Sequence, residues 1–287
     1  MAWTTGTCVG HLALLDALKT YLTVNGWTCL ADVTPDTREV YFKGTGLAGT
    51  DEIFIGVKEY VDTTNDVHNV CVGGFTGYRE GIGFTAQPGA GYLWLTLTDQ
   101  TMRYWFIVNG RRVIIIAYVN SNYVTAYAGF FLPFCNPSAY PYPMFIGANA
   151  ASAGVRYSIQ NEQNTNFFLP ISTNYRTAKY MYGGVWRDIY YSGVQTAIGS
   201  YTGYWLHQII KNGMLTTLNP DGATRYMTPI DIACNLGMIG RLDGVMYTTG
   251  YGAVAEDTLT AADGQTWMLV PDVYRTALAQ YAAFTLA

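Results

Sequence analysis

Short apolar runs are the feature that most constrains how this chain of 287 residues can fold. After residue 26 the apolar runs are brief, and several of them end at Gly, Asn or Pro, which is typical of strands and tight turns. Residues 52–60 (EIFIGVKEY) show the pattern well, because Ile53, Ile55 and Val57 share one face of an extended chain. Comparable runs occupy residues 39–43, 93–97, 104–109, 113–119, 123–132, 167–171, 180–186, 188–191, 201–207, 244–247, 265–270 and 281–286. The sequence therefore predicts a mainly β protein, a β-sandwich or barrel-like pair of sheets at the margin of the α+β class.

A single N-terminal segment, residues 8–24, has the spacing of an amphipathic α-helix. Its apolar stripe consists of Leu12, Leu15, Leu18 and Leu22. Thr5 or Thr7 is placed to cap the start, Asn25-Gly26 is a stop signal, and Trp27 is expected to fold back onto the helix. We expect the stripe to pack on the helix's own domain; the alternative is a helix that docks on a partner protein.

Asn109-Gly110 is the strongest turn signal in the chain. It separates two apolar runs, and Asn-Gly accepts the positive φ angles of a type I′ hairpin turn. Arg111 and Arg112 would open the return strand and Arg103 lies before the turn, so the hairpin is expected to carry a basic rim. We therefore expect interface contacts at Arg103, Asn109, Arg111 and Arg112, with acidic or carbonyl groups of a neighbouring subunit facing the arginine pair. A solvated arginine pair is the alternative.

Two segments near the middle of the chain are irregular. Residues 133–143 (PFCNPSAYPYP) contain four prolines, which exclude a helix or a central strand. An extended segment there would present Tyr140 and Tyr142 as further interface candidates, or would act as a rigid connector over an edge strand. Residues 147–166 are small and polar and predict a linker or a long surface loop. The chain thus divides into residues 1–148, the helix with an antiparallel β domain, and residues 149–287, a β-rich part that can be continuous with the first.

The composition bears on partners. Charged residues make up 13% of the chain, against about 25% in an average soluble protein, and there are 24 tyrosines. Such a surface suits contact with other protein, or simply a Tyr-rich all-β domain. The net charge of −4 and the lack of any basic cluster longer than Arg111-Arg112 argue against strong nucleic-acid binding. The N-terminus lacks the basic start of a signal peptide and no apolar run is long enough for a membrane helix, so we expect no membrane association.

The side chains that usually carry chemistry are scattered. Five cysteines at wide spacing argue against a disulfide framework or a zinc site and favour buried free thiols. The three histidines have no partner at metal-binding spacing, and G-x-G-x-x-G at residues 44–49 is followed by a strand, so it reads as a flexible turn. Loop carboxylates are the remaining candidates for calcium or acid–base chemistry: Asp51-Glu52, Asp62 with Asp66, and Glu256-Asp257. We expect no catalytic residue, no cofactor and no metal.

Several motifs occur together in the first half. They are Tyr104-Trp105-Phe106, Asn109-Gly110-Arg111-Arg112, the run YAGFFLPF at 127–134, and Tyr140-Pro141-Tyr142-Pro143. Residues 44–56 and 75–88 belong with them, and Leu242-Asp243-Gly244-Val245 and Glu256-Asp257-Thr258 match more weakly. Together they resemble a family of virion proteins encoded in the tail regions of tailed bacteriophages, closely over residues 1–148 and loosely beyond.

The resemblance implies a structural part of the virion, assembled in the host cytoplasm, in the tail, neck or baseplate. Its partners would be other virion proteins, and a homo-oligomeric ring of three-, six- or twelvefold order is expected. The alternative is a carbohydrate-binding module that contacts the host surface, because Trp94, Trp105 and Trp186 could stack on sugars. An enzyme acting on glycan or peptidoglycan would rest only on the scattered carboxylates.

Overall fold

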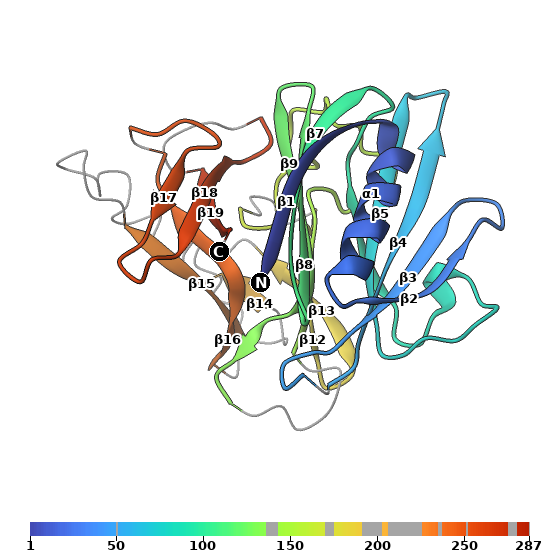
Figure 1. Cartoon of the computed structure of the whole chain (residues 1–287), viewed down its shortest axis with the longest axis horizontal. Coiled ribbons are helices and arrows are strands. Elements are labelled where there is room, and N and C mark those ends of the chain that lie inside the picture. Colours follow the sequence, from blue (N-terminus) through green and yellow to red (C-terminus); the bar gives the residue numbers. More distant parts are fainter. Residues whose placement is uncertain are drawn as a thin grey trace.

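The computed structural model describes residues 1–49, 51–135, 143–169, 175–190, 203–205, 226–234, 237–250, 252–274 and 280–286. These residues form two β-sheets and one α-helix, α1 (Gly10–Val24), with one 3-10 turn, η1 (Phe84–Ala86) (Figure 1). The mainly β fold with one N-terminal helix is confirmed.

The smaller sheet has five antiparallel strands that follow one another in sequence order. They are β2 (Thr28–Val33), β3 (Glu39–Gly44), β4 (Ile53–Asp62), β5 (Val67–Phe75) and β6 (Gly91–Leu95). Sequence neighbours pair with one another throughout this meander, because each strand can pair with the next as soon as it is formed.

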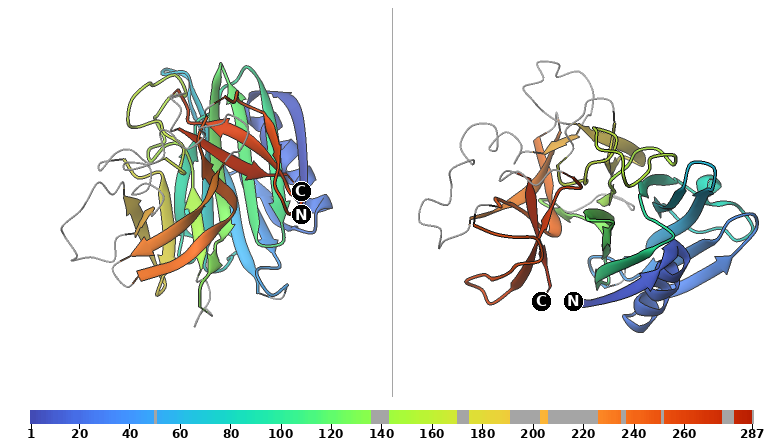
Figure 2. Two further views of the ribbon diagram at one scale, coloured as in Figure 1. Left: turned by 90° about the vertical axis from the view of Figure 1, so that its left-hand side faces the viewer. Right: turned by 90° about the horizontal axis from the view of Figure 1, so that it is seen from above.

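The larger sheet has 14 strands and draws on the rest of the chain. Its order is β1 (Ala2–Val9), β7 (Thr101–Asn109), β8 (Arg112–Val119), β9 (Asn122–Phe130), β11 (Met144–Gly147), β12 (Ala178–Tyr182), β13 (Val185–Tyr190), β14 (Gly203–Trp205), β15 (Met227–Cys234), β16 (Gly237–Thr248), β19 (Tyr281–Thr285), β18 (Thr266–Pro271) and β17 (Thr258–Thr260), and β10 (Leu132–Pro133) pairs with β16. The sheet runs without a break across residue 148 and curls, so that the two termini lie side by side (Figure 2).

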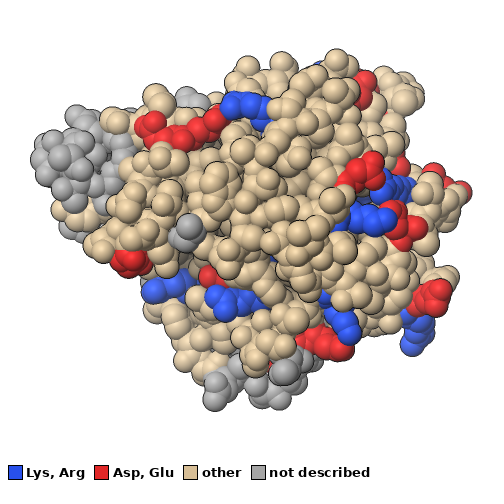
Figure 3. Space-filling view, in the orientation of Figure 1, with Lys and Arg blue, Asp and Glu red and all other residues tan. Residues whose placement is uncertain are grey.

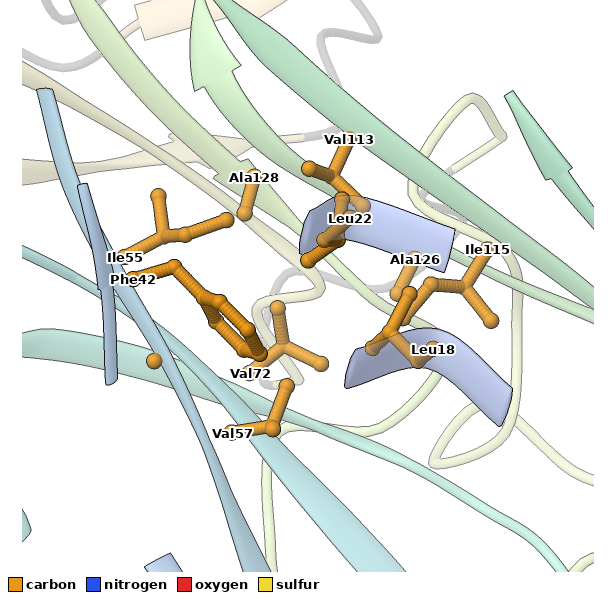
Figure 4. A pocket seen from close by; sticks show the side chains of 11 residues that line it. Leu18, Leu22, Phe42, Ile55, Val57, Val72, Val113, Ile115, Ala126 and Ala128 are labelled. Carbon is orange, nitrogen blue, oxygen red and sulfur yellow. The ribbon is translucent and has the colours of Figure 1, made fainter. Parts of the chain in front are cut away.

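The central strands β7, β8 and β9 are buried on both faces. Phe106 and Val108 face a core shared with α1 and the five-stranded sheet, whereas Trp105 and Ile107 face a second core shared with the C-terminal strands. This explains the continuous apolar run at residues 113–119, since a strand covered on both sides has no polar face. The first core contains only a small void of about 10 Å³, whose lining is entirely apolar (Figure 4). It is too small and too apolar to be a ligand site.

The helix begins later than expected. Residues 2–9 form β1, antiparallel to β7, and α1 has no side-chain cap; Thr5 instead donates from Oγ1 to the backbone oxygen of Tyr104 (2.9 Å). The expected cap was wrong because pairing with β7 extends the chain up to Val9. Leu12 is also 42% exposed, and Leu14 takes its place in the buried stripe. The return of Trp27 is confirmed: its backbone N–H donates to Leu22, and its ring is buried among the helix leucines.

The turn at Asn109-Gly110 is present, but it is not type I′. Asn109 pairs with Arg112, and Gly110 does not have a left-handed φ. The Asn109 side chain makes the turn, because its Oδ1 accepts the backbone N–H groups of Arg111 and Arg112 (3.0 Å each). Glycine is needed at 110 for close approach, since a Cβ there would overlap Oγ1 of Thr45.

The next hairpin carries the type I′ geometry instead. Asn120 and Ser121 have φ angles of 44° and 72°, between Val119 and Asn122, which pair as the last residues of β8 and the first of β9. Two consecutive non-glycine residues in the left-handed region match this turn type, whose twist fits that of the flanking strands.

Residues 147–166 were expected to be a linker or a long surface loop, and this holds only for the middle of the segment: Ser152, Gly154, Ser158 and residues 160–162 are exposed, whereas both ends are buried. Asn149, Asn164 and Asn166 are completely buried. Asn149 accepts the backbone N–H of Thr96 at its Oδ1 (2.9 Å), and Asn166 likewise accepts that of Thr125 (2.8 Å). Amide side chains that satisfy backbone groups of two sheets let a polar segment lie inside the protein.

Two expected strands also differ from the structure. The run at 180–186 is split between β12 and β13 by Gly183-Gly184, both with positive φ. Residues 167–169 are not a strand, although all three are fully buried in the second core.

Candidate functional site: an arginine-lined cleft and its surroundings

A cleft of about 690 Å³ opens where the β7–β8 turn meets the C-terminal strands. Its walls come from the turn at 109–112, the glycine-rich loop at 45–49, β16 around Asp243, and the paired strands β18 and β19. Gly46 and Gly49 in that loop have φ angles of 71° and 76°, which confirms that the G-x-G-x-x-G segment is a turn. The backbone N–H of Gly46 donates to the oxygen of Gly110 (2.8 Å) and fixes the loop against the hairpin.

Asp243 is the centre of the polar groups in this cleft. Its Oδ2 accepts hydrogen bonds from Nε of Arg111 and Nε of Arg112 (2.8 Å each) and from Nδ2 of Asn109 (3.1 Å). Three of the expected interface residues thus converge on one carboxylate of the same chain. The arginine pair was expected to meet an acidic or carbonyl group of a neighbouring subunit. Within this chain it meets Asp243, which lies 131 residues after Arg112.

The electrostatics of this cluster are unbalanced. Arg112 is 1% exposed, yet its Nη1 has no hydrogen-bond partner among the described residues, and its Nη2 contacts only Sδ of Met1 (3.2 Å). Burial tends to raise the pKa of the Asp243 carboxyl, but the charge of Arg112 and the hydrogen bonds from Arg111 and Asn109 outweigh it and hold that pKa below its ordinary value. Asp243 is therefore ionised, and one carboxylate faces two guanidinium groups.

Arg103 lies at the opposite end of β7, about 20 Å from the turn at a rise of 3.3 Å per residue. It makes a two-pronged ion pair with Glu256, Nη1 to Oε2 (2.9 Å) and Nη2 to Oε1 (2.6 Å). Its guanidinium also lies over the ring of Tyr118, 4.6 Å from the centroid, and the hydroxyl of Tyr123 donates to Glu256. The arginines of the expected basic rim are therefore paired with carboxylates in the described hairpin, and they join it to Asp243 in β16 and to Glu256 before β17.

The remaining candidates have structural partners or are not described. Tyr140 and Tyr142 lie outside the described residues, as does His207. The carboxylates considered for acid–base chemistry bond to groups near them in the sequence. Asp51 accepts the backbone N–H of Ala48, and Asp257 accepts that of Val254. Glu52 pairs with Lys43, and Asp62 accepts the N–H groups of Thr64 and Asn65. Such contacts shape turns and do not pair two carboxyl groups across a substrate.

One small cluster has residue types that bind metals. The ligand atoms of Asp66, His68 and Asp99 all lie within 4.8 Å of one another. A cation already occupies this position, because Nη2 of Arg156 contacts Oδ2 of Asp66 and its Nε donates to the Asp66 backbone oxygen (3.2 Å). Nε2 of His68 lies 3.4 Å from Oδ1 of Asp66 and 3.8 Å from Oδ2 of Asp99. The centroid of its ring lies 5.5 Å from that of the His11 ring. We interpret the cluster as an ion-pair network. Asp62, which the sequence placed with Asp66, is not part of it.

The tryptophans proposed as sugar platforms do not form one. Trp105 is buried in the second core, and Trp94 packs edge-on against Tyr60 and Tyr92. Trp186 is partly buried and donates from Nε1 to the backbone oxygen of Gly89 (2.8 Å). Flat, exposed aromatic faces are what stacking on a sugar ring needs.

Thiols differ in exposure. Cys71 is buried, Cys8 and Cys29 are partly buried, and Cys135 is exposed; all four are free. Burial raises the pKa of the Cys8 thiol to about 11. Only part of the expectation of buried free thiols therefore holds among the described cysteines.

Sequence reasoning did not identify Asp243 as the partner of the arginine pair, nor Trp267 as a residue of the cleft wall. The available signals were the motif Leu242-Asp243-Gly244-Val245 in the resemblance and the glycine within a strand pattern, since a glycine there indicates a bulge or a close approach of another group. Gly244 has a φ of 72°, and a Cβ on it would overlap Nη2 of Arg112.

Within the described residues, no helix has both the length and the apolar character needed to cross a membrane. No protein-family model matches the chain, and no curated protein matches it.

Proposed function

We propose that the chain is a structural subunit of a tailed-phage particle, which joins neighbouring virion proteins through protein–protein contacts and has no catalytic role. The observation that carries an assembly role is the open edge of the large sheet at β1. This strand has eight residues (AWTTGTCV) with no charge, proline or register shift, and it pairs only with β7 among the described strands.

The other sheet edges are protected. β2 carries a register shift and Asp32, which is held by Arg38 and Lys19. β6 is covered by a bridge from Trp94 to Ala150, and β17 is only three residues long. Folded monomers protect their edges in these ways to prevent strand pairing between molecules. A long, regular, unprotected strand is therefore the element most suited to pairing with another chain.

The surface around β1 supports the same proposal. Trp3 is 43% exposed and Val9 is 66% exposed. Figure 3 has the same orientation as Figure 1, and the surface over β1 carries no Lys, Arg, Asp or Glu side chain in it. Charged side chains gather instead over the five-stranded sheet and in small isolated groups. The exposed edge by itself does not indicate which assembly the chain joins. The resemblance of residues 1–148 to tail-region proteins is the reason for proposing a phage particle, and the proposal includes the tail, the neck and the baseplate.

The test is the oligomeric state of the purified protein, measured by light scattering during size-exclusion chromatography, with mass spectrometry of purified particles. We expect a closed oligomer for the wild type and a monomer for Thr5→Lys, because a lysine on an edge strand opposes pairing. Thr5→Ala removes the same hydroxyl without adding charge and should assemble normally. Thr258→Lys places the same charge on β17 and should also assemble.

Two outcomes would contradict the proposal. A Thr5→Lys protein that assembles like the wild type would exclude the β1 edge as the contact. Absence of the chain from purified particles would exclude the virion role.

A further inference from the structure

We propose that the cleft beside Arg112 is a binding site for a carboxylate-bearing ligand. The first reason is the surplus of buried hydrogen-bond donors. Nη1 of Arg112 has no partner among the described residues, and Nη2 has only the sulfur of Met1, which is a weak acceptor. The Arg112 side chain is 1% exposed, and its guanidinium lacks hydrogen-bond acceptors. An oxygen anion that bound there would supply the missing acceptors.

A second unpartnered donor belongs to a residue that lines the same cleft. Nε1 of Trp267 is buried and has no hydrogen-bond partner in the part of the chain that the structure describes. It belongs to the same wall as Arg112: Trp267 lies opposite Thr285 in the β18–β19 pair, and a Cβ added to Gly244 would lie 2.7 Å from Cγ2 of Thr285 while overlapping Nη2 of Arg112. Because Gly244 has no side chain, the Arg112 guanidinium can pack against this wall.

The charge balance selects the type of anion. Arg111 and Arg112 share the single carboxylate of Asp243, which leaves one positive charge within this cluster before the exposed Asp263 is counted. Arg241, at the edge of the cleft, already has its own partner in Asp231 (2.7 Å). A carboxylate supplies one negative charge and two coplanar acceptor oxygens, which match a guanidinium. A phosphate group would bring about −1.5 to −2 charges and so exceed the surplus. Asp263, exposed on the turn before β18, is the lining carboxylate that opposes an anion.

The remaining lining suits a ligand larger than a simple acid. Leu47, Leu132 and Met246 contribute apolar surface, and the volume of about 690 Å³ is within the usual range for organic ligands or for the end of a peptide. The carboxylate could belong to a small organic acid, a sugar acid or a peptide, and these sources share the same contact with Arg112.

Calorimetric titration of the full chain tests the site. The probes are butyrate, galacturonate and a short peptide with a free C-terminal carboxylate, with butyramide, galacturonamide and the amidated peptide as neutral counterparts and inorganic phosphate as the competing anion. We expect saturable binding of at least one carboxylate and none of its neutral counterpart. The probe that binds most tightly identifies the source.

Three variants make the test specific. Arg111→Gln removes the surplus charge but leaves Asp243 bonded to Arg112 and Asn109, so we expect carboxylate binding to be lost while the melting temperature stays near that of the wild type. Trp267→Phe keeps an aromatic side chain, although a smaller one, and removes the Nε1 donor, and should weaken binding about tenfold. Asp263→Asn removes the opposing carboxylate and should tighten binding. No binding of any carboxylate, equal binding by Arg111→Gln, or tighter binding of phosphate would overturn the proposal.

Discussion

At the scale of single residues, the conformation of Gly244 decides whether Asp243 and Arg112 can meet. Its φ of 72° is a left-handed conformation that side-chain-bearing residues adopt at a cost, and the space where a Cβ would lie is taken by Arg112 and Thr285. Both a backbone and a contact requirement therefore favour glycine at this position.

We expect Gly244→Ala to lower the free energy of unfolding by more than about 2 kcal/mol, since it adds a steric overlap to the φ penalty. Gly264→Ala is the matched control, because Gly264 has a φ of 85° with no atom near its Cβ position. The control should lose only about 1 kcal/mol. Urea unfolding followed by tryptophan fluorescence measures both, and equal losses would mean that the overlap with Arg112 has no energetic role.

At the scale of elements, the two successive hairpins β7–β8 and β8–β9 solve the turn differently. The first uses the Asn109 side chain to bind backbone N–H groups, and the second uses left-handed backbone at Asn120 and Ser121. The sequence Asn-Gly led to the expectation of type I′ at the first, but the approach of the loop at residue 45 fixes Gly110 in another conformation. A local turn signal is thus overridden by a contact that is distant in sequence.

For the second hairpin we expect Ser121→Gly to stabilise the protein by about 0.5–1 kcal/mol, because glycine adopts a φ of 72° without the penalty that serine carries. Ser121→Ala keeps the Cβ and should give no gain. The urea midpoint of each variant checks this. A lower urea midpoint for Ser121→Gly would show that the turn does not need left-handed backbone in solution. Glycine would then only increase the conformational entropy of the unfolded chain.

At the scale of the whole molecule, the few charges are placed in ion pairs that hold distant parts together. Arg103 with Glu256 and the Arg111–Arg112 pair with Asp243 fasten the two ends of one hairpin to the C-terminal strands. Asp32 ties α1 to the five-stranded sheet through Lys19, and hydrogen bonds from Arg38 lower the pKa of Asp32 to about 2.

These carboxylates predict how stability depends on pH. The pKa values of Asp32 and Asp243 are lower in the folded than in the unfolded chain, so their contribution is complete above the unfolded value of about 4 and is lost as the pH falls through the folded values. Urea midpoints measured between pH 6 and pH 2.5, a range chosen to span about pH 4, should therefore be level at first and then fall. Asp32→Asn should be less stable at pH 6 and show a shallower fall. An unchanged fall in that variant would mean that Asp32 is not held in its ionised form by the fold.

Much of the strand content could be predicted from periodicity alone. Runs such as residues 52–60 and 113–119 correspond closely to β4 and β8, because alternation and β-branched residues act locally. β1 was missed, since the apolar residues of AWTTGTCV lie at its two ends and do not alternate, and only its pairing with β7 makes it a strand. Half of the candidate site was predicted from the sequence. Arg111 and Arg112 were identified, whereas Asp243 lies too far along the chain for any spacing rule to connect it with them.

The sequence by itself determined the class of the fold, the helix stripe and the turn positions, since these depend on neighbours within a few residues. Tertiary structure alone decided that Asn149, Asn164 and Asn166 are buried at the two ends of a largely exposed loop, that the large sheet is continuous across residue 148, and that Asp243 holds two arginines. The physical reason is that burial of polar and charged groups is paid for by partners from elsewhere in the chain, and only the folded arrangement brings those partners within hydrogen-bond distance.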